Sequence, residues 1–293
     1  MSKKIRAFVF FILFLIFITF SPILILFSLG YTFDFEKKNF IKTGVLFVQA
    51  KPQRAQIFLS GKYKKTTDPI FGKAKILRLI PKKYLVEIKK SNYFSWKKEL
   101  EIKEGKVTEV VGVILFPEKV KFKELEKKEE FFLEKSQKPL LSCEVLFPQS
   151  LECQNKNYFP KKIGDFYIFL EGKDVFLFSF DKGKEKVLEN FLGWDEIENK
   201  ILIFSQREIW EINPQGKTLL FRSSEEIQDA VFLNENYVVF ALSGKIIILE
   251  TDVREKPNIY EIAKFEKPKL AVNSKNQILI LDNDKLFISE VLY

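Results

Sequence analysis

A long uncharged run opens the chain, and shorter hydrophobic patterns follow it. The 23 residues from Ala7 to Leu29 carry no charge. A bilayer core needs roughly 20 helical residues, whereas the apolar part of a secretory signal has about 7–15. The pattern therefore predicts a transmembrane helix within residues 1–30, which Pro22 kinks without preventing insertion. A cleaved signal ending near Ser28-Leu29-Gly30 is the second interpretation.

From Gly44 to Phe116 the hydrophobic positions recur with a period of two. In "YLVEIKK" and "WKKELEI" apolar and polar residues alternate, as they do in strands with one buried face. Gly61 and Gly105 stand between such runs, where tight turns need a positive φ. The pattern predicts six or seven short strands in a small antiparallel β-sandwich over residues 44–116, after a juxtamembrane linker over 31–43.

The rest of the chain is repetitive. Two apolar runs around a short polar turn begin at Phe166, Ile201, Tyr237 and Ile278, so that the starts are 35, 36 and 41 residues apart. A strand-like piece precedes each later pair, and a third strand follows the first three pairs. Four-stranded units at this period are typical of propeller blades. The chain is therefore predicted to be mainly β, with a β-propeller-like domain of about four incomplete blades over residues 139–293.

The last repeat lacks its outermost strand, because the chain stops at "FISEVLY". Three alternatives are open: a strand from the Phe131–Phe147 region supplies it, the array of sheets is open, or a partner completes it. An open array would expose strand edges that invite pairing. Residues 117–138, which are rich in charge, are predicted to form a linker or a ragged first strand.

The order of segments in the sandwich resembles a known family. "GVLFVQAKPQRA", "IFLSG", "TTDP", "LRLIPKKYLVEI", "NYFSW" and "LEIKEGKVTEVVGVIL" follow one another as the segments of the PEGA domain do. Three positions depart from the pattern, since Arg54, Lys82-Lys83 and Asn92 stand where the family has glycine. The residues that carry the resemblance are Pro52, Ala55, Gly61, Pro69, Tyr84, Tyr93 and Trp96.

The resemblance implies structural rather than chemical roles for these residues: turns, a tucked Tyr84 and a packing Trp96. The family is associated with cell-surface and envelope proteins, and the resemblance implies no enzymatic role. In anchored bacterial proteins, propeller-like regions often follow such domains, in the order seen here.

Composition excludes several chemistries. The chain has no histidine, which removes His-dependent nucleophilic catalysis and His-ligated zinc. Its two cysteines, Cys143 and Cys153, are too few for a zinc site made of cysteine alone. One disulfide in an oxidising compartment and two unpaired thiols are both open. We predict no catalytic residue, metal or cofactor.

Carboxylate pairs occur at Asp195 with Glu196, Glu225 with Glu226 and Asp282 with Asp284. Nothing in the sequence places any pair in a cleft, as a glycosidase requires. "LDNDK" has the Asp-x-Asp spacing of a calcium loop but lacks its glycine and distal Glu, so it is predicted to be a hairpin turn at Asn283-Asp284. Trp194 and Trp210 fall at strand positions, where core packing is favoured over sugar stacking.

Charge divides the chain into a basic and an acidic part. Residues 44–116 hold 16 Lys and Arg against 6 Asp and Glu, whereas residues 117–293 hold 26 against 31. The candidate contacts to an anionic lipid or envelope polymer are Lys62, Lys64, Lys65, Lys73, Lys75, Lys82 and Lys83. A merely solvated surface is the alternative interpretation, and nucleic acid is disfavoured by the anchor.

These patterns predict a single-pass protein of the cell membrane. Lys3, Lys4 and Arg6 precede the helix without any acid, which favours a cytoplasmic N-terminus and extracytoplasmic domains. The expected function is non-catalytic binding or scaffolding at the cell envelope, with the basic domain facing an anionic surface and the repeats presenting a face to a protein partner. The alternative is an extracytoplasmic small-ligand receptor or enzyme that uses carboxylates on a propeller face. A regulator facing the cytoplasm requires the inverse orientation.

Overall fold

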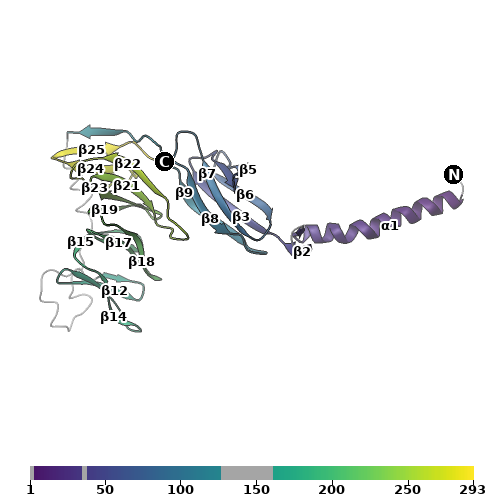
Figure 1. Ribbon diagram of the computed structural model, residues 1–293, viewed down its shortest axis with the longest axis horizontal. Coiled ribbons are helices and arrows are strands. Elements are labelled where there is room, and N and C mark those ends of the chain that lie inside the picture. Colours follow the sequence, from purple (N-terminus) through teal and green to yellow (C-terminus); the bar gives the residue numbers. More distant parts are fainter. Residues whose placement is uncertain (1–2, 35–37, 127–160) are drawn as a thin grey trace. The chain divides into compact units, whose positions relative to one another are not determined.

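The computed structural model describes residues 3–34, 38–126 and 161–293 and divides the chain into two compact units (Figure 1). The first unit comprises Met1–Ser91 and Ser95–Leu115, and the second comprises Asn92–Phe94 and Phe116–Tyr293. The Cys143–Cys153 pair, the Phe131–Phe147 region and the later part of the charged linker lie outside the described residues. The expectation of a mainly β chain with one N-terminal apolar helix is confirmed.

The helix α1 spans Lys3–Ser28 and contains Pro22. Its segment Phe8–Ser28 is 21 residues long, has a mean hydropathy of 2.9 and is 0% buried, so it is long and apolar enough to cross a membrane. Helices of this kind hold all backbone hydrogen bonds within one segment, which a hydrocarbon environment requires. Gly30 follows at a φ of +85°, a conformation that ends helices and suits glycine.

A hairpin links the helix to the sandwich. Its strands are β1 (Tyr31–Asp34) and β2 (Asn39–Lys42), which pair antiparallel within the segment expected to be a plain linker. The backbone N–H and the hydroxyl of Thr43 both donate to the carbonyl of Gly30, each at 2.8 Å. The end of the helix is thus tied directly to the residue that precedes the first sandwich strand.

The sandwich has seven strands in two sheets, in line with the predicted number. The sheet orders are β6-β3-β9 and β5-β4-β7-β8. The strands are β3 (Gly44–Lys51), β4 (Gln56–Leu59), β5 (Lys62–Thr66), β6 (Lys73–Leu79), β7 (Lys83–Lys89), β8 (Trp96–Glu101) and β9 (Val107–Ile114). Alternate residues of β3 and β8 are buried, as the period of two predicted.

One pairing departs from the expected antiparallel arrangement, because β3 and β9 run parallel. The chain leaves β8 at Glu101, turns at Gly105 and enters the opposite sheet at β9. This change of sheet brings β9 alongside β3 in the same direction, whereas hairpin-connected strands pair antiparallel. The turn at Gly105 was therefore read correctly from the sequence, but its topological consequence was not.

Among its described residues, 116–126 and 161–293 with the short segment 92–94, the second unit has four sheets of four strands each. Their orders are β11-β12-β13-β14, β15-β16-β17-β18, β19-β20-β21-β22 and β10-β25-β24-β23. The strands are β10 (Phe122–Leu125), β11 (Lys161–Ile163), β12 (Phe166–Glu171), β13 (Asp174–Ser179), β14 (Gly183–Leu188), β15 (Phe191–Ile197), β16 (Lys200–Ser205), β17 (Glu208–Asn213), β18 (Gly216–Arg222), β19 (Ile227–Asn234), β20 (Tyr237–Leu242), β21 (Lys245–Glu250), β22 (Ile259–Lys264), β23 (Lys269–Val272), β24 (Ile278–Asp282) and β25 (Lys285–Ser289).

The fourth sheet obtains its outermost strand from a distant part of the chain. β10 pairs antiparallel with β25, so that Phe122 lies opposite Ser289 and Leu125 opposite Leu286. The strand therefore comes from residues 122–125 of the segment predicted to be a linker or a ragged first strand, ahead of the Phe131–Phe147 region that was one of the three alternatives. This pairing covers the edge of β25, which would otherwise invite pairing with another chain.

Consecutive sheets share hydrophobic cores. Buried residues of the first two sheets, including Ile168, Val175 and Ile203, form one cluster. A second cluster joins the second and third sheets through residues such as Phe204, Ile227 and Phe240. A meander of four strands cannot bury a face alone, so each sheet depends on its neighbour for stability.

Two buried aspartates reinforce this stacking with hydrogen bonds between sheets. Asp195 on β15 accepts a hydrogen bond from the backbone N–H of Phe232 on β19 at 2.7 Å. Asp229 on β19 accepts one from the backbone N–H of Leu270 on β23 at 2.8 Å. Both carboxylates are at most 6% exposed, and buried hydrogen bonds to a charged group are among the strong ones.

We predict that Asp229→Ala lowers the free energy of unfolding by about 3 kcal/mol, because it leaves the buried N–H of Leu270 without an acceptor. Asp229→Asn, which keeps one acceptor oxygen, should cost about half as much. Chemical denaturation of the full chain measures both, with the exposed Glu261→Ala as the matched control. Equal stability of Asp229→Ala and the control would contradict the proposed role.

Candidate functional site

The motif residues within residues 44–116 lie in the loops and core of that segment. Arg54 and Asn92, which stand where the PEGA pattern has glycine, adopt positive φ values of 60° and 67°. Glycine takes this conformation without steric cost, and asparagine tolerates it better than arginine. Gly61 has a φ of 78° in the β4–β5 turn. The backbone at these positions is thus the one that a glycine-containing pattern requires.

The remaining motif residues bury side chains or shape the same loops. Ala55 is fully buried, donates its N–H to the hydroxyl of Thr67 and accepts from the N–H of Thr67. Trp96 is also buried, and the hydroxyl of Tyr84 donates to the carbonyl of Ile80 at 3.1 Å. Pro52 and Pro69 lie in the loops after β3 and before β6, and Tyr93 forms an isolated bridge with Pro117.

The turn at Thr67–Gly72 is organised by Asp68. Its carboxylate accepts backbone hydrogen bonds from Phe71 and Lys73, both at 2.6 Å, and from Ile70 at 2.9 Å. The hydrogen bond from Phe71 is the main reason that the pKa of Asp68 lies below its usual value. Asp68 therefore stabilises the turn between β5 and β6, and neither of these two strands contains an acidic residue.

A cluster of charged residues around the buried Glu87 lies on β7 and β8. Burial by itself would raise the pKa of Glu87, but hydrogen bonds from Lys89 and Lys97, each with an N–O distance of 2.7 Å, outweigh it and lower the pKa. Lys98 is 2% exposed, and its Nζ lies 5.6 Å from the centre of the Trp96 ring. Lys98 thus belongs to the interior of the sandwich, whereas Lys89 and Lys97 are partly exposed and pair with the buried Glu87.

All seven lysines predicted as anionic-surface contacts are exposed, and they divide between two parts of the sandwich. Lys62, Lys64 and Lys65 lie on β5, and Lys73 and Lys75 lie on β6. Each of these strands is an edge strand of its sheet, and Lys65 donates to the carbonyl of Lys75 at 3.4 Å. Lys82 and Lys83 lie at the start of β7, toward the same end of the strands as Lys62, whereas Lys65, Lys73 and Lys75 lie toward the other end.

We predict that the first unit loses stability as the pH falls below about 4, the usual range of carboxyl pKa values. Asp68 and Glu87 have lowered pKa values in the folded chain, so their contribution is complete above the unfolded pKa and is lost as the pH falls through the folded pKa. Melting temperatures of the full chain between pH 6 and pH 3 measure this loss.

The double variant Asp68→Asn with Glu87→Gln should flatten that profile, whereas the exposed Glu109→Gln should leave it as in the unsubstituted chain. The assignment to these two carboxyl groups would be refuted by a double variant that keeps the full dependence on pH.

The second unit contains a cavity of about 940 Å³ along the first strands of three consecutive sheets. Its walls come from β15, β19, β23 and the turn after β23. The polar groups that line it include Trp194, Glu196, Glu198, Gln228, Lys269, Asn273, Ser274 and Asn276. Apolar residues such as Phe204, Val231 and Ala271 complete the lining, so polar and apolar groups share the walls.

The structure separates the carboxylates that the sequence paired. Asp195 and Glu196 are both among the residues that line the cavity, but Asp195 also accepts the hydrogen bond from the N–H of Phe232 between the sheets. Asp282 is buried and accepts from the N–H groups of Glu266 and Lys267. The predicted turn at Asn283-Asp284 is confirmed, with both residues at positive φ between the paired ends of β24 and β25. None of these pairs forms a two-carboxylate site.

Glu225 and Glu226 belong to an exposed turn rather than to the cavity. Lys245 approaches Glu225 at 3.5 Å, and the side chain of Gln206 donates to Glu226 at 3.1 Å. Within the ranges that the structure describes, no group of three or more Cys, Asp and Glu side chains could hold a metal ion. The ring nitrogen of Trp210 donates to Glu208 at 2.8 Å, and its ring packs on the core of the first two sheets, as expected of a structural residue.

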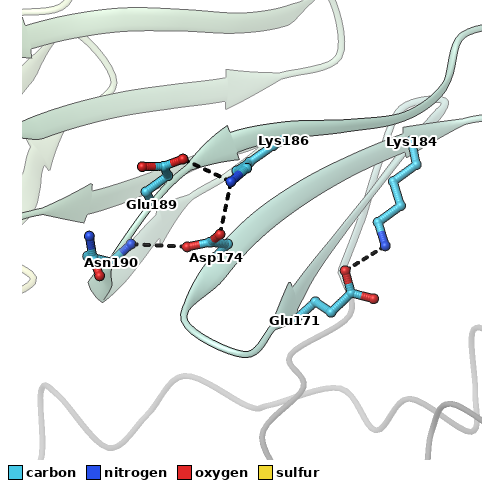
Figure 2. Close-up of polar contacts among 6 residues, drawn as sticks. All are labelled: Glu171, Asp174, Lys184, Lys186, Glu189 and Asn190. Atoms are coloured by element: carbon cyan, nitrogen blue, oxygen red, sulfur yellow. Dashed lines mark hydrogen bonds and ion pairs between the residues drawn. The ribbon is translucent and has the colours of Figure 1, made fainter.

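A polar cluster on the first sheet stabilises its strands. Figure 2 shows Lys186 between Asp174 at 3.2 Å and Glu189 at 2.8 Å, while Lys184 bonds Glu171 at 2.6 Å. The hydrogen bond that Lys186 donates to Glu189 is the main reason that the pKa of Lys186 is raised. Of these acids, Asp174 lies on the strand next to that of Lys186, Glu189 directly follows the strand of Lys186, and Glu171 lies on β12, two strands from Lys184, so the cluster consists of surface ion pairs of the sheet.

Sequence reasoning missed most of the cavity. Its polar residues Gln228, Lys269 and Asn273 fall on or next to the strand-like pieces that precede each repeat pair. Those pieces are the lining strands, so their position before each pair was the available signal. Trp194, which was expected to pack in the core, both packs on that core and lines the cavity.

No protein-family model and no curated protein matches the chain. Among solved structures, the extracellular domain of BT4673 from Bacteroides thetaiotaomicron matches with a TM-score of 0.34, 9% identity and coverage of 89% of this chain and 31% of that one. YCF48 from Cyanidioschyzon merolae matches with a TM-score of 0.30, 11% identity and coverage of 81% and 77%. Streptogramin B lyase matches with a TM-score of 0.34, 11% identity and coverage of 47% and 53%.

The chain thus spans about half the length of the lyase and under a third of the BT4673 domain. At these low scores and identities the comparisons support no functional argument. The function proposed below is therefore argued from the residues of this chain.

Proposed function

We propose that the chain is a membrane-anchored, non-catalytic binding or scaffolding protein of the cell envelope. The helix α1 tethers it, the basic sandwich faces an anionic surface, and the repeat domain presents a binding face to a partner. In this proposal the first unit is a PEGA-like domain, the N-terminus is cytoplasmic and both units are extracytoplasmic.

One observation carries the proposal: an apolar helix of 21 residues is tied by Thr43 to a strongly basic sandwich. A helix that exposes large apolar side chains around its whole circumference favours a lipid environment. The seven exposed lysines of the sandwich then lie on a domain held close to that bilayer. The positive φ values of Arg54 and Asn92 support the resemblance to the PEGA domain.

The cavity of the second unit supports a second candidate function, an extracytoplasmic receptor for a small ligand. Glu196 and Glu198 bring two carboxylates to a wall that also holds Trp194. Carboxylates beside an aromatic ring suit a ligand with a cationic group, which can bond the acids and lie over the ring. The volume of about 940 Å³ lies within the usual size range of small-ligand sites.

We expect proteases added to intact cells to digest both units, because the proposed orientation places everything after Gly30 outside the cytoplasm. An antibody against a C-terminal tag follows the loss of the full-length band, with a cytoplasmic protein as the control for lysis. Protection of the tag until the cells are lysed would contradict the envelope location and would favour a partner in the cytoplasm.

The receptor function predicts that a cationic ligand raises the melting temperature of the chain, since selective binding stabilises the folded state by about 2.7 kcal/mol at 100 times the Kd. Spermidine is a suitable probe, with a neutral trisaccharide for comparison. Glu196→Gln and Glu198→Gln should abolish the rise, and Glu225→Gln, which removes an exposed acid outside the cavity, should keep it. A rise that survives the two cavity substitutions would contradict this function.

A further inference from the structure

The two sheets of the sandwich share one end that lies next to the helix. Gly44 begins β3 opposite Leu79, the last residue of β6. Lys83 begins β7 opposite Glu101, and the carbonyl of Lys82 accepts from the N–H of Ile102. We call this the helix-proximal end, because the chain arrives at Gly44 directly from the Gly30–Thr43 hydrogen bonds.

Three contacts fix the end of α1 against this part of the sandwich. Thr43 bonds Gly30 through both its N–H and its hydroxyl, and the carbonyl of Thr43 accepts from the N–H of Gly105 at 3.2 Å. The guanidinium of Arg78, next to the end of β6, lies 3.6 Å from the centre of the Phe27 ring. Arg78 is thus placed over the last turn of the apolar segment, within the range of cation–π attraction.

Cations concentrate at this end. Lys62 follows the β4–β5 turn, whose Ser60 N–H donates to the carbonyl of Leu85 near the start of β7. Lys62, Arg78, Lys82 and Lys83 are all exposed, as is Lys42 in the hairpin that leads into β3. Three acids lie nearby: Glu99, which is exposed opposite Leu85, Glu101, which is 3.8 Å from Lys103, and Glu104. The net charge of the helix-proximal end is therefore positive.

Exposed apolar side chains lie among these cations. Leu77 is 63% exposed on β6 and Leu85 is 46% exposed on β7. Large apolar residues beside Lys and Arg are typical of surfaces that sit at the headgroup level of a bilayer, where the stems of the basic side chains also find apolar surroundings.

The other predicted lysines lie toward the opposite end. Lys73 pairs with Gln49, near the end of β3, and Lys75 pairs with Phe47. Lys65 pairs with Ile57, which lies opposite Ile88 near the end of β7. These three lysines form a second set of equal charge on the same domain, farther along the strands from the helix.

We propose that the helix-proximal end binds the phosphate-bearing headgroups of anionic lipids in the bilayer that α1 spans, through Lys62, Arg78, Lys82 and Lys83. A helix of 21 residues is about 31 Å long, close to the thickness of the hydrocarbon core. Phe27 then lies at the edge of that core, and Arg78 above it lies where phosphates are found. Leu77 and Leu85 reach the boundary between headgroups and acyl chains.

This inference rests on the proposed anchoring and narrows it, because it selects one end of the sandwich and one kind of anionic partner. An envelope polymer could engage lysines anywhere on the domain, whereas headgroups are within reach only of side chains held near the end of the helix. The two lysine sets therefore distinguish a bilayer from a polymer as the source of the negative charge.

The test uses the full chain in lipid nanodiscs made of phosphatidylcholine alone or with phosphatidylglycerol added. An amine-reactive reagent labels the lysines, and mass spectrometry measures the rate at each position. Labelling of Lys62, Lys82 and Lys83 should slow by about fivefold when phosphatidylglycerol is added, the factor expected for one lysine attracted to an anionic membrane. Labelling of Lys65, Lys73 and Lys75 should be unchanged.

Two triple variants of equal charge complete the experiment. Lys62→Gln, Lys82→Gln and Lys83→Gln together should abolish any rise in melting temperature caused by phosphatidylglycerol, whereas Lys65→Gln, Lys73→Gln and Lys75→Gln together should keep it. Equal labelling changes in both sets, or no change in either, would overturn the inference while the chain stays in the disc. A chain that fails to co-elute with discs would overturn the anchoring itself.

Discussion

Along Phe8–Ser28 the helix α1 exposes apolar side chains on every face, and none of that segment is buried against the rest of the described chain. Each square ångström of such surface left in water costs about 25 cal/mol, so a helix of this kind requires an apolar surrounding. Everything else in the first unit follows from where the helix ends. Gly30 stops it, Thr43 holds the carbonyl of Gly30 with two hydrogen bonds, and β3 begins at the next residue. These contacts therefore hold the cations near that junction close to the end of the helix.

In the second unit the constraint is the burial of apolar sheet faces, because no four-stranded sheet buries its face alone. Shared cores join the first three sheets, Asp229 links the third to the fourth, and β10 covers the last edge. Stacking sheets by their first strands leaves a cavity along β15, β19 and β23. A frame of stacked sheets with a polar cavity suits binding, and Asp195, which lines the cavity and also bonds the N–H of Phe232, belongs to both.

Much of this architecture could be predicted from the sequence, since period-two patterns and the repeat of strand pairs report directly on buried faces. The Asn283-Asp284 turn was also readable, because those residues tolerate positive φ. The pairing of β10 with β25 could not be predicted from the sequence. The four residues of β10 lie in a charged segment without a period, and they pair with a strand more than 160 residues away. The parallel pairing of β3 with β9 could not be predicted either, because it depends on the chain crossing from one sheet to the other after β8.

The candidate sites were predicted less well. The seven lysines could be named from composition, but their division between two ends of the sandwich depends on strand register. Arg78 was passed over because a single arginine on a strand gives no sign of lying over Phe27. The cavity side chains Gln228, Lys269 and Asn273 formed no recognisable motif either, since they come from two different repeats and only the strand-like pieces that carry them were visible in the sequence.

The central claim is that α1 stays attached and holds the chain in a bilayer. Alkaline carbonate extraction of membranes from cells that express the chain with a C-terminal tag tests it most directly, because this treatment removes proteins without a membrane-spanning segment. The account predicts a tagged species of the full 34.5 kDa in the membrane pellet. A species shortened by the length of the helix and recovered in the supernatant would contradict it and identify the segment as a cleaved signal.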